Sequence, residues 1–373
     1  MASKEILYVT QFLPPSNSDG NTGGTISNLD MLRALARSYS VTVLSLDSIA
    51  RETDFACEPF RVIIRRAPAW RAPQLFLHWL DFVRGKTRDA LDCATPPEAV
   101  IATTSTLAAF DVCPPTTSRI AVVRAYENFG LQCPWVPVRQ RVNLGKLAAV
   151  RRFQDRRLMR SADAVLTNSQ FMRRAISERF CINSERVHVL LQACGVEPSS
   201  VVAPEGTIGF VNRGPEKGLS FVLELARRSP HLRYLVYGHE HGRPDALPSN
   251  IEWRGWASDR AAMFASAKLW LVPSLWSEPF GRVSIEAQAA DRAVLVARTG
   301  GLPETILERQ FLMEGFEAEA WLIRIRSLLE SAPNSLRQNG AKIRERFSSE
   351  AQDERSLSAF AHILYESEDH NHV

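Results

Sequence analysis

The fold is decided by residues 269–287, LWLVPSLWSEPFGRVSIEA, where a short apolar run is followed by a polar loop and a helical pattern. Residues 269–272 predict a strand that is buried on both faces, because they are continuously apolar. Residues 277–287 then form the loop at the carboxyl end of this strand and the start of a helix. Ligands bind at such strand ends in parallel α/β sheets. This stretch therefore predicts an α/β fold and places a candidate site within it.

The same alternation continues toward both ends of the chain. An apolar run at residues 6–12, a glycine-bearing loop, apolar positions at helical spacing and a second run at 41–46 predict a βαβ unit. Further strands are predicted at residues 99–102, 119–123, 164–167, 208–211, 234–237 and 294–297, with a helix at 220–228. Residues 198–206 have the composition of a linker. Two α/β halves are therefore predicted to meet near residue 204.

The composition is typical of a soluble enzyme with two domains. The 373 residues exceed what one hydrophobic core usually supports, and 45% of them are hydrophobic and 23% charged. No apolar stretch approaches the roughly 20 residues that cross a bilayer, and the start lacks a signal-peptide pattern, so we expect a cytoplasmic protein. A net charge of +4 does not indicate nucleic acid as a partner. The six cysteines form no Cys-x-x-Cys pair, so reduced and mostly buried thiols are expected.

Two glutamates, Glu278 and Glu286, lie eight positions apart in the deciding stretch. On a helix this spacing corresponds to about 12 Å along the axis. Paired carboxylates of a retaining glycosidase lie roughly 5 to 5.5 Å apart, so this pair instead suits distant parts of one elongated ligand. The amides of residues 280–283 lie at the predicted helix N-terminus, which favours an anion. A sugar on a diphosphate matches this pattern; the alternative is a surface helix with two solvated glutamates.

Other loops at predicted strand ends carry cations or glycines. Arg213 and Lys217 bracket a glycine–proline turn and can neutralise the charge of a departing diphosphate, although a solvated turn is the alternative. Residues 299–304, TGGLPE, and the pair Gly23 and Gly24 allow the backbone to approach a ligand closely.

These motifs, in this order, resemble the retaining GT-B glycosyltransferases of family four. The resemblance is carried by the two glutamates, the Lys217-Gly218 turn, the glycine pairs at 23–24 and 300–301, and residues 158–169. It implies an α/β fold of two Rossmann-like domains that face a central cleft. The implied domains are an acceptor-binding domain at residues 1–200, a nucleotide-sugar-binding domain at 205–345, and a C-terminal helix at 346–373 that crosses back to the first domain.

The resemblance also implies roles for single residues. Glu278 would contact the hydroxyls of the donor sugar, and Lys217 and Arg213 its phosphates, as the catalytic residues. The implied donor-binding residues are Gly23, Gly24, Arg254, Gly255, Phe280, Gly281, Val283 and Glu286, with Glu286 on the ribose and the backbone of 254–256 on the base. Many relatives carry a histidine after an N-domain strand, where this chain has Tyr126, Glu127 and Asn128. Glu127 and Asn128 are expected on the acceptor side.

The implied activity moves a sugar from a nucleotide diphosphate sugar to a hydroxyl of a glycan, lipid-linked or small-molecule acceptor, with retention of configuration. We expect no cofactor and no metal, because the chain lacks an Asp-x-Asp motif and His239 and His241 have no third ligand nearby. Dinucleotide-binding and P-loop motifs are also missing from the sequence. The alternatives are a nucleotide-sugar epimerase with the same fold and a non-catalytic sugar-nucleotide-binding protein.

Residues 139–160 carry eight basic residues against Asp155, with apolar residues interleaved. This pattern predicts a cationic amphipathic helix, which is either a solvated face of its domain or a site for anionic lipid or a phosphorylated acceptor. Aromatic residues from Trp70 to Phe82 lie among arginines and form a second such region. Both regions predict peripheral attachment of the first half to the inner face of a membrane.

Overall fold

The computed structural model describes residues 4–13, 23–46, 51–67, 73–92, 95–125, 153–198, 201–257 and 259–370. The chain divides into two compact units. Unit 1 comprises residues 1–168, 172–191 and 352–373, and unit 2 comprises residues 169–171 and 192–351. The division falls after Leu191, upstream of the linker at 198–206, and the last residues of the chain belong to unit 1.

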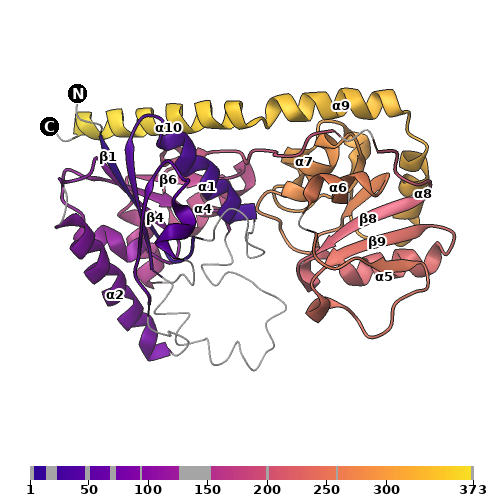
Figure 1. Ribbon diagram of the computed structural model, residues 1–373, viewed down its shortest axis with the longest axis horizontal. Coiled ribbons are helices and arrows are strands. Elements are labelled where there is room, and N and C mark those ends of the chain that lie inside the picture. The colour runs from indigo at the N-terminus through magenta and orange to yellow at the C-terminus, as the bar shows by residue number, and fades with distance from the viewer. Residues whose placement is uncertain are drawn as a thin grey trace. The chain divides into compact units, whose positions relative to one another are not determined.

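Unit 1 is built on a seven-stranded parallel sheet with the order β3-β2-β1-β4-β5-β6-β7. Figure 1 labels β1, β4 and β6 of this sheet. Its strands are β1 (Glu5–Thr10), β2 (Ser40–Ser45), β3 (Arg61–Ile64), β4 (Ala99–Thr103), β5 (Ser118–Val122), β6 (Ala164–Thr167) and β7 (Val187–Val189). Its helices are α1 (Gly23–Leu35), α2 (Pro73–Leu91), a segment at 153–160, α4 (Gln170–Phe180) and α10 (Ser349–His370), with short 3-10 turns η1 (Glu52–Phe55), η2 (Leu107–Val112) and η4 (Ser184–Arg186).

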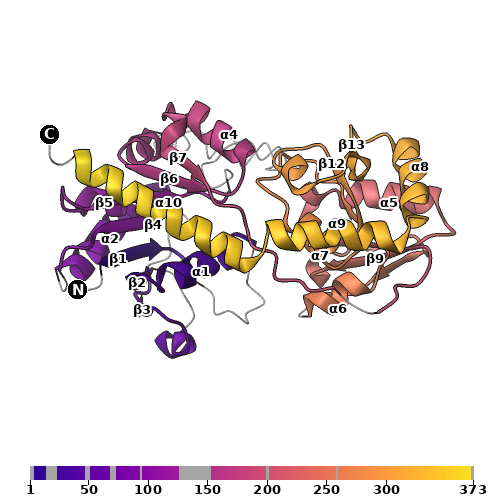
Figure 2. The same cartoon turned by 90° about the horizontal axis from the view of Figure 1, so that it is seen from above.

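Both faces of the unit 1 sheet are buried. Tyr8 of β1 belongs to one buried cluster with Leu32 of α1 and Phe360 of α10, so these two helices cover the same face. Figure 2 shows α10 running across the strands of this sheet. Leu7 and Val9 alternate with Tyr8 along β1 and are buried as well. Burial on both sides explains why these strands appear in the sequence as continuous apolar runs.

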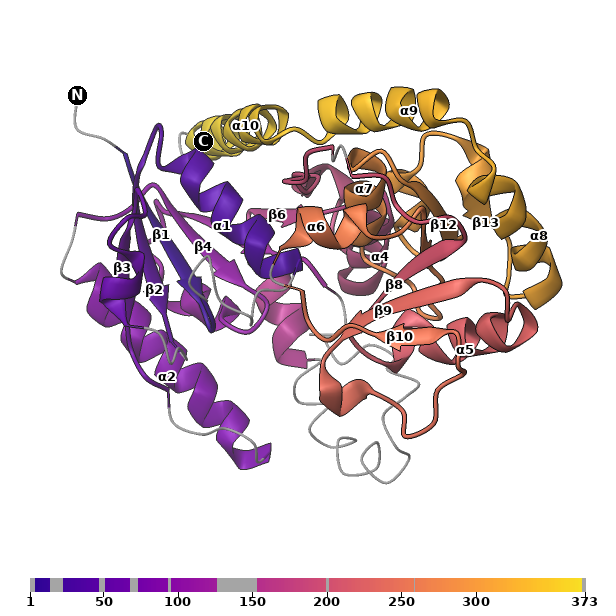
Figure 3. The same cartoon turned by 45° about the vertical axis from the view of Figure 1, so that its right-hand side comes forward.

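Unit 2 is built on a six-stranded parallel sheet with the order β10-β9-β8-β11-β12-β13. Its strands are β8 (Thr207–Asn212), β9 (Arg233–Gly238), β10 (Ile251–Trp253), β11 (Leu269–Val272), β12 (Ala293–Ala297) and β13 (Leu312–Met313). Its helices are α5 (Leu219–Arg228), α6 (Arg260–Ala265), α7 (Arg282–Ala289), α8 (Ala318–Leu329) and α9 (Pro333–Arg346), with short turns η5 (Pro215–Lys217), η6 (Glu240–Gly242), η7 (Leu302–Thr305) and η8 (Arg309–Phe311). Figure 3 shows β8, β9 and β10 lying side by side.

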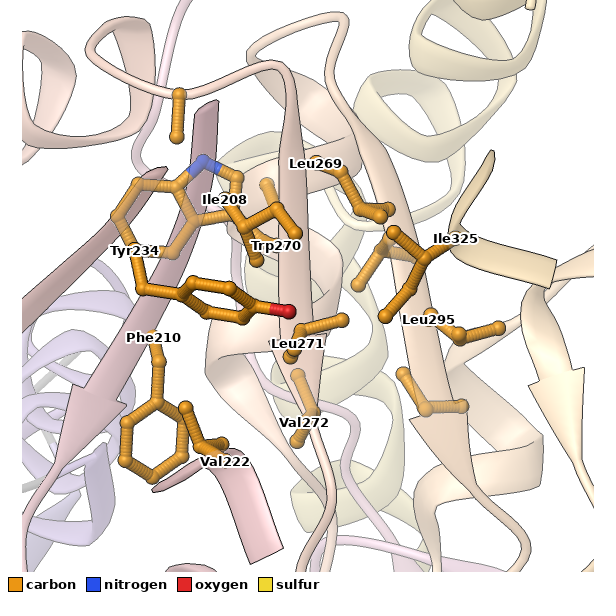
Figure 4. Packing of buried hydrophobic residues seen from close by; sticks show 14 of the residues in the cluster. Ile208, Phe210, Val222, Tyr234, Leu269, Trp270, Leu271, Val272, Leu295 and Ile325 are labelled. Atoms are coloured by element: carbon orange, nitrogen blue, oxygen red, sulfur yellow. The ribbon is translucent and has the colours of Figure 1, made fainter. Parts of the chain in front are cut away.

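The unit 2 core joins this sheet to its helices. Phe210 and Tyr234, from neighbouring strands, lie in one buried cluster with Val222 of α5 and Ile325 of α8 (Figure 4). Trp270 of β11 faces Gly209 of β8, where any side chain would overlap with the indole ring. This close packing keeps β8 and β11 adjacent, and the loops that follow them carry the candidate site.

Candidate functional site

Three loops of unit 2 begin at the same edge of the sheet. Strand β8 pairs with β11, and β11 pairs with β12, in parallel register. The loops after Asn212, Val272 and Ala297 are therefore neighbours, because parallel strands end at a common edge. These loops contain the Lys217 turn, the Glu278 segment and the glycine pair at 300–301. The structure brings together three motifs that are up to 84 positions apart in the sequence, from Lys217 to Gly301.

The Glu278 loop is fixed on one side by the Lys217 turn. Gly218 has φ +92°, and a side chain at this position would overlap with the carbonyl of Pro273. The amide of Leu275 also donates to the carbonyl of Glu216 at 2.8 Å. Only glycine allows both the left-handed backbone and the close approach.

The glycine pair fixes the other side of the same loop. Gly300 has φ +57°, and a side chain there would overlap with the backbone of Ser277 and Glu278. The amide of Gly301 donates to the carbonyl of Glu278 at 2.7 Å, and the Thr299 hydroxyl donates to the carbonyl of Ser274 at 3.2 Å. The glycines predicted to approach a ligand therefore approach the Glu278 backbone in this structure.

The carboxylate of Glu278 accepts hydrogen bonds from three side chains. The Lys217 ammonium lies 2.7 Å from Oε1 and 2.9 Å from Oε2. Oε2 also accepts from the Ser274 hydroxyl at 2.9 Å and from the Trp276 indole N–H at 2.8 Å. The Lys217 and Glu278 side chains are 21% and 13% exposed. No motif in the sequence indicates Ser274 or Trp276 as partners of Glu278, although both precede it closely in the same loop.

The pKa of Glu278 is below its usual value. Burial raises this pKa, but the charge of Lys217 and the hydrogen bonds from Lys217, Trp276 and Ser274 outweigh burial and lower it. The carboxylate is therefore ionised at neutral pH and paired with a cation at the strand ends.

The expected geometry of the two glutamates is wrong in one respect. Helix α7 begins at Arg282, so Glu278 lies in the loop before the helix and the axial spacing of about 12 Å does not apply. Glu286 lies within α7, where its buried carboxylate accepts from Arg282 Nε at 2.8 Å and is paired with Arg260. Neither glutamate is a solvated surface residue.

The start of α7 offers backbone groups. Gly281 precedes the helix with φ +111°, a left-handed conformation that favours glycine, and a side chain there would overlap with Leu302. The Phe280 side chain is buried against Phe347, with ring centroids 5.9 Å apart. Val283 is partly buried. Any ligand contact from Phe280 must therefore come from its backbone.

Arg213 lies in different surroundings from Lys217. Its guanidinium lies 4.5 Å from the centroid of the Trp256 ring. The His239 ring stacks on Trp256 at 4.8 Å, and His241 stacks on His239 at 5.3 Å. This stack joins residues that follow β8, β9 and β10, and no motif in the sequence indicates it.

The turn predicted to meet a nucleobase lies next to this stack. Gly255 has φ +67°, and its carbonyl accepts from the amide of Gly238 at 2.9 Å. Arg254 is exposed and contacts Glu252, with 2.5 Å between Nε and Oε1. Within the described ranges, no group of three or more His, Cys, Asp or Glu side chains could hold a metal ion.

Unit 1 holds the remaining predicted residues. Gly23 and Gly24 are the first residues of α1. Glu127 and Asn128 lie outside the described residues, as do Trp70 and residues 139–152. Cysteine placement differs from expectation, because Cys57 and Cys181 are exposed and Cys113 and Cys194 are partly buried. Mostly buried thiols were therefore the wrong expectation for the part of the chain that the structure describes.

The described parts of residues 139–160 and of the region from Trp70 to Phe82 do not form one continuous exposed surface of arginines and apolar side chains. Trp79 is 1% exposed and donates to the carbonyl of Ser105 at 2.7 Å, so it belongs to the core. Arg157 forms two hydrogen bonds with Asp111, at 2.7 and 2.8 Å. Phe153, an apolar residue of the same basic segment, is 69% exposed, as a free apolar face would require. Among the described helices, none is both long and apolar enough to cross a membrane.

Two family models match the chain. Residues 22–193 match the glycosyl transferase 4-like domain, and residues 205–331 match the glycosyl transferases group 1. A D-inositol 3-phosphate glycosyltransferase of Segniliparus rotundus is 34% identical over 167 residues, which cover 39% of this chain and 36% of that protein. The enzyme of the same name from Corynebacterium glutamicum is 27% identical over 226 residues, which cover 50% of this chain and 54% of that protein. The matches thus span about a third to a half of the length of these relatives.

Solved structures of the same fold cover nearly the whole chain. A sucrose-phosphate synthase from Thermosynechococcus elongatus has a TM-score of 0.74 at 17% identity, over 97% of this chain and 99% of that chain. Anabaena HepE, in complex with UDP and glucose, has a TM-score of 0.72 at 17% identity, over 96% and 99%. Both units of this chain match family models, and both carry a parallel sheet. The chain belongs to the GT-B glycosyltransferases of family four.

Proposed function

We propose that this protein transfers a sugar from a nucleotide diphosphate sugar to an acceptor hydroxyl, with retention of anomeric configuration. The observation that carries the proposal is the Lys217–Glu278 pair, which three loops hold at the carboxyl edge of the unit 2 sheet. A cation and an ionised carboxylate at one point suit a ligand that carries phosphate next to sugar hydroxyls.

The carboxylate geometry supports a sugar contact for Glu278. An ionised carboxylate has about four positions at which it can accept hydrogen bonds, two on each oxygen. Among the described residues, Lys217, Ser274 and Trp276 all contact Oε2, whereas Lys217 is the partner of Oε1. Oε1 therefore retains capacity for a hydroxyl of the donor sugar.

Lys217 and Arg213 supply charge for the departing nucleoside diphosphate, and the amides of Phe280 and Gly281 add donors at the start of α7. In our proposal Glu286 meets the ribose, the backbone at Arg254 and Gly255 meets the base, and Gly23 and Gly24 allow close backbone approach to the donor. The buried pairing of Glu286 with Arg282 would orient its carboxylate.

The proposed reaction balances without an added base. The bond between the anomeric carbon and the phosphate oxygen breaks, and a bond from the same carbon to the acceptor oxygen forms on the same face. The departing diphosphate takes the proton of the acceptor hydroxyl. Cations at the diphosphate stabilise the charge that grows as this bond breaks.

Transfer is favoured over the alternatives by the relatives, which are named as glycosyltransferases. A thermal-shift screen across nucleotide sugars, starting with UDP-sugars because HepE was crystallised with UDP and glucose, would identify the donor. Release of nucleoside diphosphate that depends on an acceptor would support the proposal. Interconversion of the sugar without an acceptor would indicate an epimerase, and donor binding without either reaction would indicate a non-catalytic binding protein.

We expect turnover to be independent of metal, because lysine, arginine and helix amides take the place of an ion at the diphosphate. Nucleoside diphosphate release should be unchanged in excess EDTA. Complete loss of activity in EDTA, with recovery on adding manganese or magnesium, would contradict this expectation.

We also propose that the acceptor is lipid-linked or phosphorylated, and that unit 1 attaches to the cytoplasmic face of a membrane. The support is the basic content of residues 139–160, where each basic residue near an anionic surface contributes about 1 kcal/mol. Arg157 contributes less than expected, since Asp111 already neutralises it. Vesicles of anionic lipid should sediment the protein at low salt and release it at high salt. A protein that stays in the supernatant at low salt would favour a soluble acceptor.

A further inference from the structure

Trp276 contacts both charged members of the candidate site. Its indole N–H donates to Glu278 Oε2 at 2.8 Å. The ammonium of Lys217 lies 5.0 Å from the centroid of the same indole ring, within the range of a cation–π interaction. One side chain therefore holds the carboxylate with its edge and attracts the ammonium with its face.

We propose that Trp276 is a positioning residue that sets the geometry of the Lys217–Glu278 pair. This inference rests on the proposed function of that pair. Trp276 acts through Glu278 and Lys217, and no contact between Trp276 and substrate is required.

The hydrogen-bond pattern explains how the position is set. Oε2 accepts from Lys217, Ser274 and Trp276, and so its capacity is used by the protein. This arrangement stops the carboxylate from rotating and presents Oε1 in one orientation. Loss of the indole N–H leaves Ser274 as the one neutral side-chain donor to this oxygen among the described residues, and the carboxylate gains rotational freedom.

The same contact favours the charged form of Glu278. A hydrogen bond from the indole to the ionised carboxylate adds to the effect of Lys217, the charged side chain that contacts it. In the neighbouring loop at 299–304 the charged side chain is Glu304, whose carboxylate accepts from the amides of Gln170 and Phe171. The Gly301 amide of the same loop donates to the Glu278 backbone carbonyl. Without the indole N–H, the pKa of Glu278 rises, so the carboxylate becomes protonated at a higher pH.

Two variants separate the contribution of the indole N–H from the contribution of the aromatic face. Trp276→Phe keeps an aromatic face for Lys217 but removes the N–H, and Trp276→Leu removes both. Trp321→Phe is the matched control, because it removes an indole hydrogen bond to Gly315 elsewhere in unit 2. The readouts are kcat and KM for the donor across pH, together with the rate at which reductive methylation labels Lys217, measured by mass spectrometry.

We expect Trp276→Phe to lower kcat about tenfold with little change in KM, and to move the acidic limb of kcat/KM to higher pH. Trp276→Leu should lower kcat further and speed the labelling of Lys217. Trp321→Phe should change neither the acidic limb nor the labelling.

The outcomes distinguish this inference from the proposed function. If the wild-type protein transfers no sugar but Lys217 labelling rises in Trp276→Leu, the proposed function fails and the positioning role stands. If the wild-type protein transfers sugar, but the Trp276 variants change neither the acidic limb of kcat/KM nor the labelling of Lys217, the positioning role is overturned.

Discussion

At the scale of single residues, Glu278 is stabilised in its charged form inside a partly buried site. Because the pKa of Glu278 is lowered in the folded state, its pairing with Lys217 stabilises the fold at pH values above the ordinary pKa of a glutamate. That contribution is lost as the pH falls through the lowered pKa. The charge that a donor would meet is therefore present throughout the neutral range, and Lys217 always has its partner there.

Replacing either member of this pair should lower turnover at least tenfold. Glu278→Gln keeps the shape but removes the charge that pairs with Lys217, and Lys217→Ala removes a cation that would stabilise the departing diphosphate. Release of nucleoside diphosphate would measure both effects.

Two exposed ion pairs of unit 2 provide matched controls for these variants. Glu224→Gln breaks a pair with Arg228 on α5, and Lys268→Ala breaks a pair with Glu205. Exposed pairs of this kind contribute little, so both controls should keep normal rates. If Glu278→Gln and Lys217→Ala also keep normal rates, the donor-site assignment fails.

At the scale of elements, the centre of each sheet was predictable and the edges were not. The predicted strands at 164–167 and 269–272 coincide with β6 and β11, which are buried along their whole length. The four strands without a prediction, β3, β7, β10 and β13, lie at the sheet edges. They have two to four residues and are only partly buried. A short edge strand contributes only two or three apolar residues, which are too few to be told from other short apolar segments of the sequence.

The loops between elements need glycine for its left-handed backbone and, at some positions, for the close approach of another segment. One pair of variants can separate these two reasons. Gly300 and Gly315 both have left-handed φ values, +57° and +70°. A side chain at Gly300 would also overlap with the Glu278 backbone, whereas Gly315 has open space around its Cβ position. Gly315→Ala should cost roughly 1–2 kcal/mol of stability, from the backbone conformation alone.

Gly300→Ala should cost more than Gly315→Ala and should also lower turnover, because the Glu278 loop must shift. Chemical denaturation and the transfer assay would measure the two effects. Equal destabilisation by the two variants, with normal turnover in both, would mean that the loop accommodates the extra methyl group.

At the scale of the whole molecule, the chain passes back to unit 1 after building unit 2. Residues 352–373 belong to unit 1, and Phe360 of α10 is fully buried in the cluster that contains Ile6 and Tyr8. The most distant parts of the chain therefore share one core. Unit 1 cannot complete this core until the C-terminal helix has been synthesised.

Phe360→Ala should destabilise unit 1 by about 3–5 kcal/mol, since it removes a large buried ring. Tyr365→Ala, on the same helix but 66% exposed, is the control and should have little effect. Scanning calorimetry should show a lower transition temperature for unit 1, while donor binding should still raise that of unit 2. An unchanged unfolding profile for Phe360→Ala would contradict the packing of α10 in this core.

The α/β class, the central strands and the motifs of the candidate-site loops were predictable from the sequence, because apolar runs and glycine or charged residues at fixed spacing are local signals. Which of these residues meet is seen only in the folded chain. It placed Glu278 ahead of α7, paired it with Lys217 across 61 positions, and added Ser274 and Trp276 as its donors. It also placed Arg213 on Trp256 and Trp79 in the core. The physical reason is that strand order and side-chain direction bring together residues distant in sequence, and no local pattern encodes that pairing.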